Sequence, residues 1–315
     1  MKKINSIIIG CGNIGYGYDS NNPDYVQTHF RALSKDSRFN LLAVVENNNN
    51  IRKKIQKNHR IESVNCIGDL RNDIINEVDF IAISASDNFK IDILSQIADS
   101  KLKPKFILFE KPIARSQEEM TFFINAFSRL KCELRFNFMR RADPNYLWLS
   151  RNIEEILCEN PKLKFDIKFS GDMHNCLSHG IDFLLGLFGN DKFNNLDIEK
   201  LNKIWLIKNR NIELLIRNIE IGVSIFEITI YSGKVKIYYS HTDENILIKK
   251  VGSWHGFMGN FYTNNDSLEL GADKYMSFTY DEVARFYNEG ISSLTTIDEA
   301  VLTFNLIERL GAEYE

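Results

Sequence analysis

The sequence has almost no net charge. Its 39 Lys and Arg residues are offset by 42 Asp and Glu residues, which leaves a formal charge of −3 over 315 residues. Nucleic acids and anionic membrane surfaces attract proteins with a clear excess of basic residues. The composition therefore argues against both as partners.

Cysteine is scarce and shows no pattern of pairing. The chain has five cysteines, an odd number, and no two of them form a Cys-x-x-Cys spacing. Disulfide-stabilised scaffolds need paired cysteines and an oxidising compartment. We therefore expect the protein to work in a reducing compartment, the cytoplasm.

Long apolar runs are also missing. No stretch approaches the roughly 18 apolar residues that a membrane-spanning helix requires, so we expect no membrane association. A chain of 315 residues is longer than one ordinary core and favours two domains.

Short apolar segments alternate with amphipathic ones in the first part of the chain. Strands are predicted at 6–10, 40–45, 79–84, 105–109 and 133–138, with helical segments between them. Continuous apolar strands that alternate with helices are typical of a parallel sheet covered on both faces. The sequence thus predicts an α/β dinucleotide-binding domain over residues 1–138, with a doubly wound parallel sheet of the Rossmann type.

The pattern changes after about residue 140. From 203 to 251, strand-like segments follow one another without helices between them, which indicates an antiparallel sheet. We predict a second α+β domain over residues 139–315, with a large open, mainly antiparallel sheet, that binds substrate. Because a broad sheet face is rarely left in water, we expect this sheet to form a homodimer or homotetramer.

A glycine-rich segment follows the first predicted strand. Its six residues are Gly10, Cys11, Gly12, Asn13, Ile14 and Gly15. In a strand–helix unit, the first glycine makes a tight turn, the second admits a pyrophosphate and the third allows close packing of helix on strand. The dipole of a following helix would add to anion binding. The alternative is an ordinary glycine-rich turn.

Polar residues at the ends of later strands extend this predicted cofactor site. Glu46 follows the second strand, where an acid accepts hydrogen bonds from ribose hydroxyls and repels a 2′-phosphate, so NAD is favoured over NADP. The alternative is a solvated glutamate. Ser84, Ser86 and Asn88 follow the third strand and are expected beside the nicotinamide ribose.

The strand at 105–109 ends in Glu110, Lys111 and Pro112. Ligands of parallel sheets bind at the carboxyl ends of strands, so Glu110 and Lys111 are candidates for binding the cofactor. The lysine amine is suited to hydrogen-bond a substrate hydroxyl and to take part in proton transfer. The alternative is a surface Glu–Lys pair in a loop.

Four segments occur in an order that resembles a known family of oxidoreductases. They are "GCGNIG", "FEKPIA", "NFMRRADP" and "SHGIDFLLGLFG". The chain resembles the glucose–fructose oxidoreductase, inositol dehydrogenase and rhizopine-catabolism (Gfo/Idh/MocA) family over nearly its whole length. The resemblance implies that Lys111 is catalytic and that His179 is the family's helical histidine, with Asp182 three residues later.

Three positions differ from this family, one of them Leu177, which stands where the family usually has a glycine. Asn175 stands where the family usually has an aspartate; it can hydrogen-bond a sugar hydroxyl but cannot act as a base. Lys90 stands where family members often have a histidine, which we interpret as a neutral replacement.

Asn175, His179 and Asp182 have the spacing of one helix face, so we predict that they contact substrate or act in its proton transfer. The alternatives are a helix cap for Asn175 and a core role for His179. A metal site that combines His179 with His174 and Cys176 matches no known spacing, so no metal is expected.

Arg141 and Trp254 are further candidates for binding substrate. A salt bridge at a helix start is the alternative for Arg141, and packing at a subunit interface is the alternative for Trp254.

The sequence therefore predicts an NAD(P)-dependent dehydrogenase. The resemblance implies that its substrate is a secondary alcohol of a sugar, amino sugar, cyclitol or nucleotide sugar. Two alternatives remain: a dinucleotide-binding sensor without turnover, and an NAD-dependent glycosidase that recycles its cofactor.

Overall fold

The computed structural model describes the backbone of the chain except for residues 1, 21, 23, 158–162, 221, 234, 241–243, 254–259, 270–273 and 313–315. Side chains at 87, 88, 251–253, 260–266, 269 and 312 also lie outside this description. The chain forms two compact units. The first combines Met1–Ala142 with Asp273–Val301, and the second combines Asp143–Ala272 with Leu302–Glu315.

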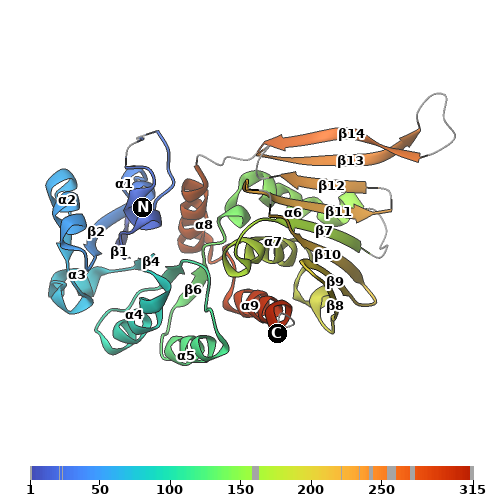
Figure 1. Cartoon of the computed structure of the whole chain (residues 1–315). Coiled ribbons are helices and arrows are strands. Elements are labelled where there is room, and N and C mark those ends of the chain that lie inside the picture. Colours follow the sequence, from blue (N-terminus) through green and yellow to red (C-terminus); the bar gives the residue numbers. More distant parts are fainter. Residues whose placement is uncertain are drawn as a thin grey trace. The chain divides into compact units, whose positions relative to one another are not determined.

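The first unit is built on a six-stranded parallel sheet (Figure 1). Its strands are β1 (Ile4–Ile9), β2 (Phe39–Val45), β3 (Glu62–Val64), β4 (Phe80–Ile83), β5 (Phe106–Phe109) and β6 (Glu133–Phe136). They lie in the order β3-β2-β1-β4-β5-β6, which is the doubly wound Rossmann order. The predicted fold of the first domain is therefore confirmed.

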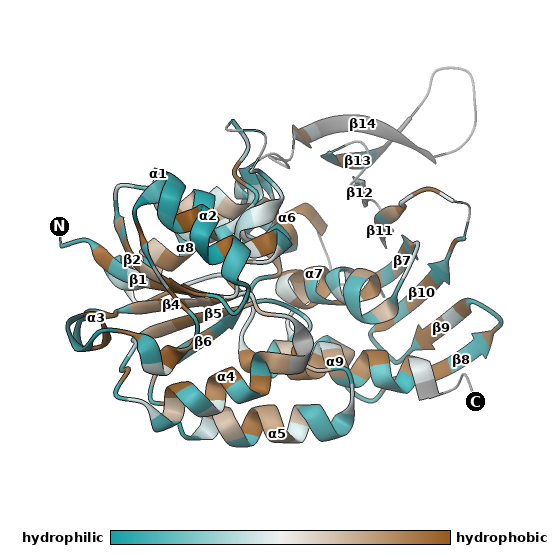
Figure 2. Ribbon diagram, turned by 60° about the vertical axis from the view of Figure 1, so that its left-hand side comes forward, coloured by the Kyte–Doolittle hydropathy of each residue, from teal (hydrophilic) through white to brown (hydrophobic). Residues whose placement is uncertain are grey.

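Helices cover both faces of this sheet. They are η1 (Asn13–Gly17), α1 (His29–Lys35), α2 (Asn49–His59), η2 (Ile67–Asp69), α3 (Asn72–Glu77), α4 (Asp87–Asp99), α5 (Gln117–Ser128), η3 (Met139–Ala142) and α8 (Tyr275–Glu289). Helices α1, α2 and α8 lie on one face and α4 and α5 on the other (Figure 2). Every residue of β4 and β5 is consequently buried, which explains their continuous apolar sequences.

Helix α8 corrects the predicted domain boundary. Met276, Tyr280 and Val283 belong to the same apolar core as strands β1 and β4. The Tyr280 ring meets the Phe80 ring edge to face, with centroids 5.7 Å apart. Residues 139–142 and 273–301 therefore belong to the first unit, and the predicted second domain of residues 139–315 is too long.

The second unit contains an eight-stranded sheet in the order β14-β13-β12-β11-β7-β10-β9-β8. The strands are β7 (Leu163–Phe169), β8 (Asp197–Leu201), β9 (Ile204–Lys208), β10 (Ile212–Asn218), β11 (Phe226–Ser232), β12 (Val235–Ser240), β13 (Asn245–Ser253) and β14 (Asn260–Glu269). All neighbouring strands are antiparallel except β7 and β10. The prediction of a large, mainly antiparallel sheet is confirmed.

One face of this sheet carries the apolar core of the second unit. The remaining helices are α6 (Pro144–Leu157), η4 (Met173–Leu177), α7 (Ser178–Phe188), η5 (Asn190–Phe193) and α9 (Ile297–Ala312). Side chains of α6, α7 and α9 pack with inward-facing residues of the strands. The other face carries cross-strand ion pairs, such as Lys168 with Glu227.

Among the residues that the structure describes, none of the helices combines the length and the apolar character needed to cross a bilayer.

Candidate cofactor and active site

A cleft of about 340 Å³ opens in the first unit at the carboxyl ends of β1, β2 and β4. Strand β1 lies between β2 and β4, so the cleft is at the point where the strand order reverses, the usual ligand site of such sheets. The cleft is lined by Ile9, Gly10, Gly12, Val45, Glu46, Asn47, Asn65, Cys66, Ile67, Ser84, Ala85, Ser86, Phe89, Asp92, Ile93 and Gln96.

The glycines of the turn after β1 differ in what surrounds them. Gly10 has a φ of +89°, and a Cβ there would lie 2.5 Å from the Ala85 nitrogen. A Cβ on Gly15 would lie 2.4 Å from the Gly10 oxygen. A Cβ on Gly12 would meet no described atom within 4 Å. Gly10 and Gly15 are thus required by packing, whereas Gly12 leaves space beside the cleft.

The element after the glycines is short. The glycine segment leads into η1, a π-helical turn of only five residues, and α1 begins at His29. The intervening chain is held by Asp19, whose carboxylate accepts hydrogen bonds from the backbone N–H groups of Gln27 and Thr28. The helix that follows the glycines directly is therefore short, and the contribution of its dipole to anion binding stays a prediction.

Glu46 lies at the end of β2 and is buried beside the glycine turn. Its Oε2 accepts a hydrogen bond from the Cys11 N–H at 2.6 Å, and its Oε1 accepts one from the Asn48 N–H at 2.7 Å. Each carboxylate oxygen has a second lone pair that can accept a hydroxyl. The solvated-glutamate alternative is not observed. Burial and the nearby Glu46 carboxylate raise the pKa of the Cys11 thiol, so Cys11 remains a neutral, small residue.

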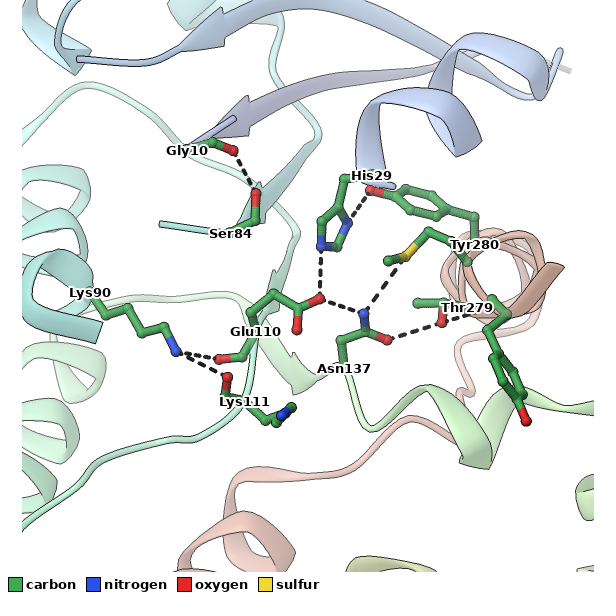
Figure 3. A network of polar contacts seen from close by, with 11 residues as sticks. Gly10, His29, Ser84, Lys90, Glu110, Lys111, Asn137, Thr279 and Tyr280 are labelled. Atoms are coloured by element: carbon green, nitrogen blue, oxygen red, sulfur yellow. Dashed lines mark hydrogen bonds and ion pairs between the residues drawn. The ribbon is translucent and has the colours of Figure 1, made fainter. Parts of the chain in front are cut away.

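Ser84 and Ser86 follow β4. The Ser84 hydroxyl donates a hydrogen bond to the Gly10 carbonyl oxygen at 2.6 Å (Figure 3), so it supports the glycine turn. Ser86 lines the cleft and is the N-cap residue of α4. Asn88 belongs to α4, but its side chain is outside the described residues.

Glu110 is the centre of a buried polar network that the sequence did not predict. Its Oε1 accepts hydrogen bonds from His29 Nε2 at 2.9 Å and from Asn137 Nδ2 at 2.5 Å (Figure 3). Two further contacts extend the network. His29 Nδ1 lies 2.9 Å from the Tyr280 hydroxyl, and the Thr279 hydroxyl donates a hydrogen bond to Asn137 Oδ1 at 3.0 Å. The Glu110 carboxylate thus joins the segments that follow β5 and β6 to α1 and α8.

The network keeps Glu110 ionised. Burial by itself would raise the pKa of this carboxyl, but the hydrogen bond and charge of His29, the Asn137 amide and the charge of Lys90 together lower it below its ordinary value. Burial and the Glu110 charge raise the pKa of Tyr280. The buried site therefore contains a carboxylate and a protonated phenol.

Lys111 follows Glu110 and is half-buried. Its bond to Pro112 is a cis peptide bond. Lys90, from α4, is buried, and its ammonium group donates hydrogen bonds to the carbonyl oxygens of Glu110, Lys111 and Pro112. The alternative of a surface Glu–Lys pair is wrong for Glu110.

The histidine segment lies in the second unit, on η4 and α7. Asp172 is the N-cap residue of η4 and accepts a hydrogen bond from the Asn175 N–H at 2.7 Å, so Asn175 is not the cap. Asn175 and His179 are half-buried, whereas Asp182 is buried. The His179 and Phe226 ring centroids are 6.3 Å apart.

Gly180 explains how His179 is placed next to the sheet. A Cβ on this glycine would lie 3.1 Å from the end of the Ile167 side chain. Helix α7 therefore packs closely on β7 directly beside His179.

Arg141 forms a buried ion pair with Glu299 at 2.8 Å within the first unit. This contact favours a salt bridge over the predicted contact with substrate. Trp254 lies outside the described residues.

His174 Nε2 lies 3.3 Å from the Glu308 carboxylate. In the described part of the chain, no three His, Cys, Asp or Glu side chains are grouped so that they could hold a metal ion.

Lys111 belongs to the first unit and His179 to the second. That both groups act on one substrate stays a prediction.

Comparison with known proteins yields similarity in structure alone. No protein-family model matches the chain, and no curated protein sequence matches it. Solved structures of oxidoreductases do match it over almost the whole chain, at 11–13% identity.

Three of these structures are informative. A putative NADPH-dependent oxidoreductase from Desulfitobacterium hafniense has a TM-score of 0.72 at 12% identity, over 98% of this chain and 94% of the other. UDP-N-acetylglucosamine 3-dehydrogenase from Acidithiobacillus ferrooxidans has a TM-score of 0.69 at 11% identity, over 98% of this chain and 97% of the other. An oxidoreductase from Agrobacterium radiobacter, in complex with NAD+, L-tartaric acid and magnesium, has a TM-score of 0.69 at 13% identity, over 98% of this chain and 95% of the other. The chain thus has the fold of the Gfo/Idh/MocA oxidoreductases.

Proposed function

We propose that this protein, which has the Gfo/Idh/MocA fold, is an NAD-dependent oxidoreductase. It transfers a hydride between a nicotinamide cofactor and a secondary alcohol of a sugar, amino sugar, cyclitol or nucleotide sugar. The main support is the cleft at the carboxyl ends of β1, β2 and β4, which is lined by the glycine turn and Glu46. Strand β5, next to β4, leads directly into Glu110 and Lys111.

The residues of this cleft suit a dinucleotide. The open space beside Gly12 admits a pyrophosphate to the backbone amides of the turn. Glu46 has lone pairs left for ribose hydroxyls, and its charge opposes a 2′-phosphate. Arg52 donates hydrogen bonds to the Glu46 carbonyl oxygen and to the side chains of Asn49 and Asn65. This arrangement favours NAD over NADP.

The roles of the protein groups follow from the hydride chemistry that a bound nicotinamide supplies. The Lys111 amine hydrogen-bonds the reacting hydroxyl and takes part in its proton transfer. His179 accepts the hydroxyl proton at its imidazole nitrogen. Asn175 hydrogen-bonds a neighbouring hydroxyl and takes no proton.

A spectroscopic screen tests the proposal. Free and nucleotide-linked sugars are incubated with the protein and either NAD or NADP, and the absorbance of the reduced cofactor is followed. We expect stoichiometric NADH with one substrate class. UDP-linked amino sugars come first, because one structure of the same fold is a UDP-N-acetylglucosamine 3-dehydrogenase.

The same assay with Lys111→Ala should show a kcat lower by about 10²–10⁴, the usual contribution of general acid–base catalysis. Lys101→Ala changes an exposed lysine after α4 and should leave kcat unchanged. Undiminished turnover by Lys111→Ala would remove the catalytic assignment. Cleavage without net NADH would indicate a glycosidase, and NADH binding without turnover of any sugar would indicate a sensor.

A further inference from the structure

Lys90 is a charged residue in an interior position. Its side chain on α4 is only 3% exposed. The ammonium nitrogen lies 2.9 Å from the Glu110 carbonyl oxygen, 3.1 Å from that of Pro112 and 3.3 Å from that of Lys111. It is also 5.6 Å from the centre of the Phe109 ring.

This environment matches the chemistry of an ammonium group. Lysine has three N–H donors and no acceptor, and three consecutive carbonyl oxygens surround it here. Burying a charge is costly unless it is paired and hydrogen-bonded. The carbonyl oxygens and the negative charge of Glu110 offset that cost. A neutral side chain could fill the same volume but could not donate to three carbonyl groups.

We propose that Lys90 is a positioning residue that fixes the backbone of Glu110, Lys111 and Pro112 and so orients the Lys111 side chain for proton transfer. The proposal rests on the catalytic role proposed for Lys111.

The contacts of Lys90 complete the support of this short segment. His29 and Asn137 hold the Glu110 side chain on one side, and Lys90 holds the carbonyl groups on the other (Figure 3). Lys111 therefore stands on a backbone that is held before and after it. Such restraint matters because a displacement of about 1 Å can reduce a rate about 100-fold.

The test compares the wild-type protein with Lys90→Met, which keeps the side-chain length and removes the charge. We expect kcat to fall about 10- to 100-fold, while the Kd for NADH, measured by fluorescence, changes by less than about twofold. Lys101→Ala is the control for loss of a lysine near α4. A uniform loss of NADH binding and turnover would indicate a merely structural role and would overturn the proposal.

Chemical rescue separates the ammonium group from simple filling of space. Lys90→Ala removes the atoms of a propylammonium ion, so propylammonium should restore kcat and 1-propanol, of similar size but neutral, should not. Equal rescue by both compounds overturns the proposal. If the other variants do not fold, Lys90→Gln, which retains N–H donors, replaces them. A Lys90→Gln variant whose backbone amides at 110–114 lose their protection from hydrogen exchange, but whose kcat equals that of the wild type, would overturn the proposal.

A measurement that needs no turnover distinguishes failure of this inference from failure of the proposed function. Hydrogen–deuterium exchange should become faster in residues 110–114 of Lys90→Ala and return to the wild-type rate with propylammonium. If the wild type oxidises no sugar, the proposed function fails, but the exchange result still decides whether Lys90 fixes this backbone. Unchanged exchange in Lys90→Ala overturns the proposal whatever the activity.

Discussion

At the scale of single residues, Glu110 shows how a strand end can contain a buried charge. Its carboxylate is paired with His29 and bonded to Asn137, and the pKa of the carboxyl is lowered despite burial. Because the charged form is stabilised in the folded state, ionisation of Glu110 contributes to folding.

This gives a pH-dependent prediction. The stabilisation should be complete above the ordinary pKa of 4.5 and should be lost as the pH falls through the lowered folded value. Glu110→Gln should reduce the free energy of unfolding near neutral pH by about 3–5 kcal/mol, because it breaks a buried pair. The difference from wild type should shrink below pH 4.5, as measured by urea unfolding at several pH values.

Glu118→Gln is the matched control, because Glu118 is exposed on α5; it should alter stability by less than about 0.5 kcal/mol. A difference between wild type and Glu110→Gln that stays constant into the acid range would contradict an ionised, stabilising Glu110.

At the scale of elements, two glycines of the turn from β1 into η1 meet different requirements. Gly15 allows close packing, and Gly12 leaves space open beside the cleft. Gly15 is needed for packing, since an added Cβ would lie 2.4 Å from the Gly10 oxygen. Gly12 faces open space and has no such packing reason to be glycine. A pyrophosphate that approaches the turn from the cleft, as proposed above, would supply that reason.

Two alanine variants should therefore differ. Gly15→Ala should lower the free energy of unfolding by about 1–3 kcal/mol, the usual cost of overpacking. Gly12→Ala should leave stability unchanged but weaken NADH binding at least about tenfold, or 1.4 kcal/mol, because its methyl group takes the space of the pyrophosphate. Thermal unfolding and NADH titration measure the two effects, and normal NADH affinity of a folded Gly12→Ala would argue against a dinucleotide at this turn.

At the scale of the whole molecule, the second unit leaves one sheet face without covering helices of its own among the described residues. Polar and charged side chains alternate with the core positions of β7 and β10, and cross-strand ion pairs such as Lys164 with Glu213 lie on this outer face. Leu215, half-buried, lies among them. We continue to predict that this face joins subunits into a homodimer or homotetramer.

Light scattering should therefore give a multiple of 36.6 kDa for the wild type. Leu215→Arg, which places a charge in the middle of the outer face, should shift the mass toward the single chain without changing the core. Lys101→Ala, in the first unit, should retain the wild-type mass. A wild-type protein that stays monomeric at micromolar concentration would remove this prediction.

The sequence by itself determined the class of each unit and most of its elements, but not β3 or α8. The continuous apolar strands of the first unit, the uninterrupted strands of the second, the glycine segment and the Glu-Lys-Pro segment are all local patterns, because they depend on hydrophobic period and on residues that are neighbours in the chain. These patterns predicted the Rossmann sheet, the antiparallel sheet and the position of the cleft.

Only the tertiary structure decided which distant residues meet. His29 reaches Glu110 across 81 positions and Tyr280 across 251, and α8 returns to the first unit after the whole of the second sheet. The spacing of residues along the chain does not indicate which group a buried histidine or lysine will contact. Contacts such as those of Lys90 arise where helices pack on strand ends. Buried polar groups there must be hydrogen-bonded, and which groups are close enough to pair depends on the tertiary structure.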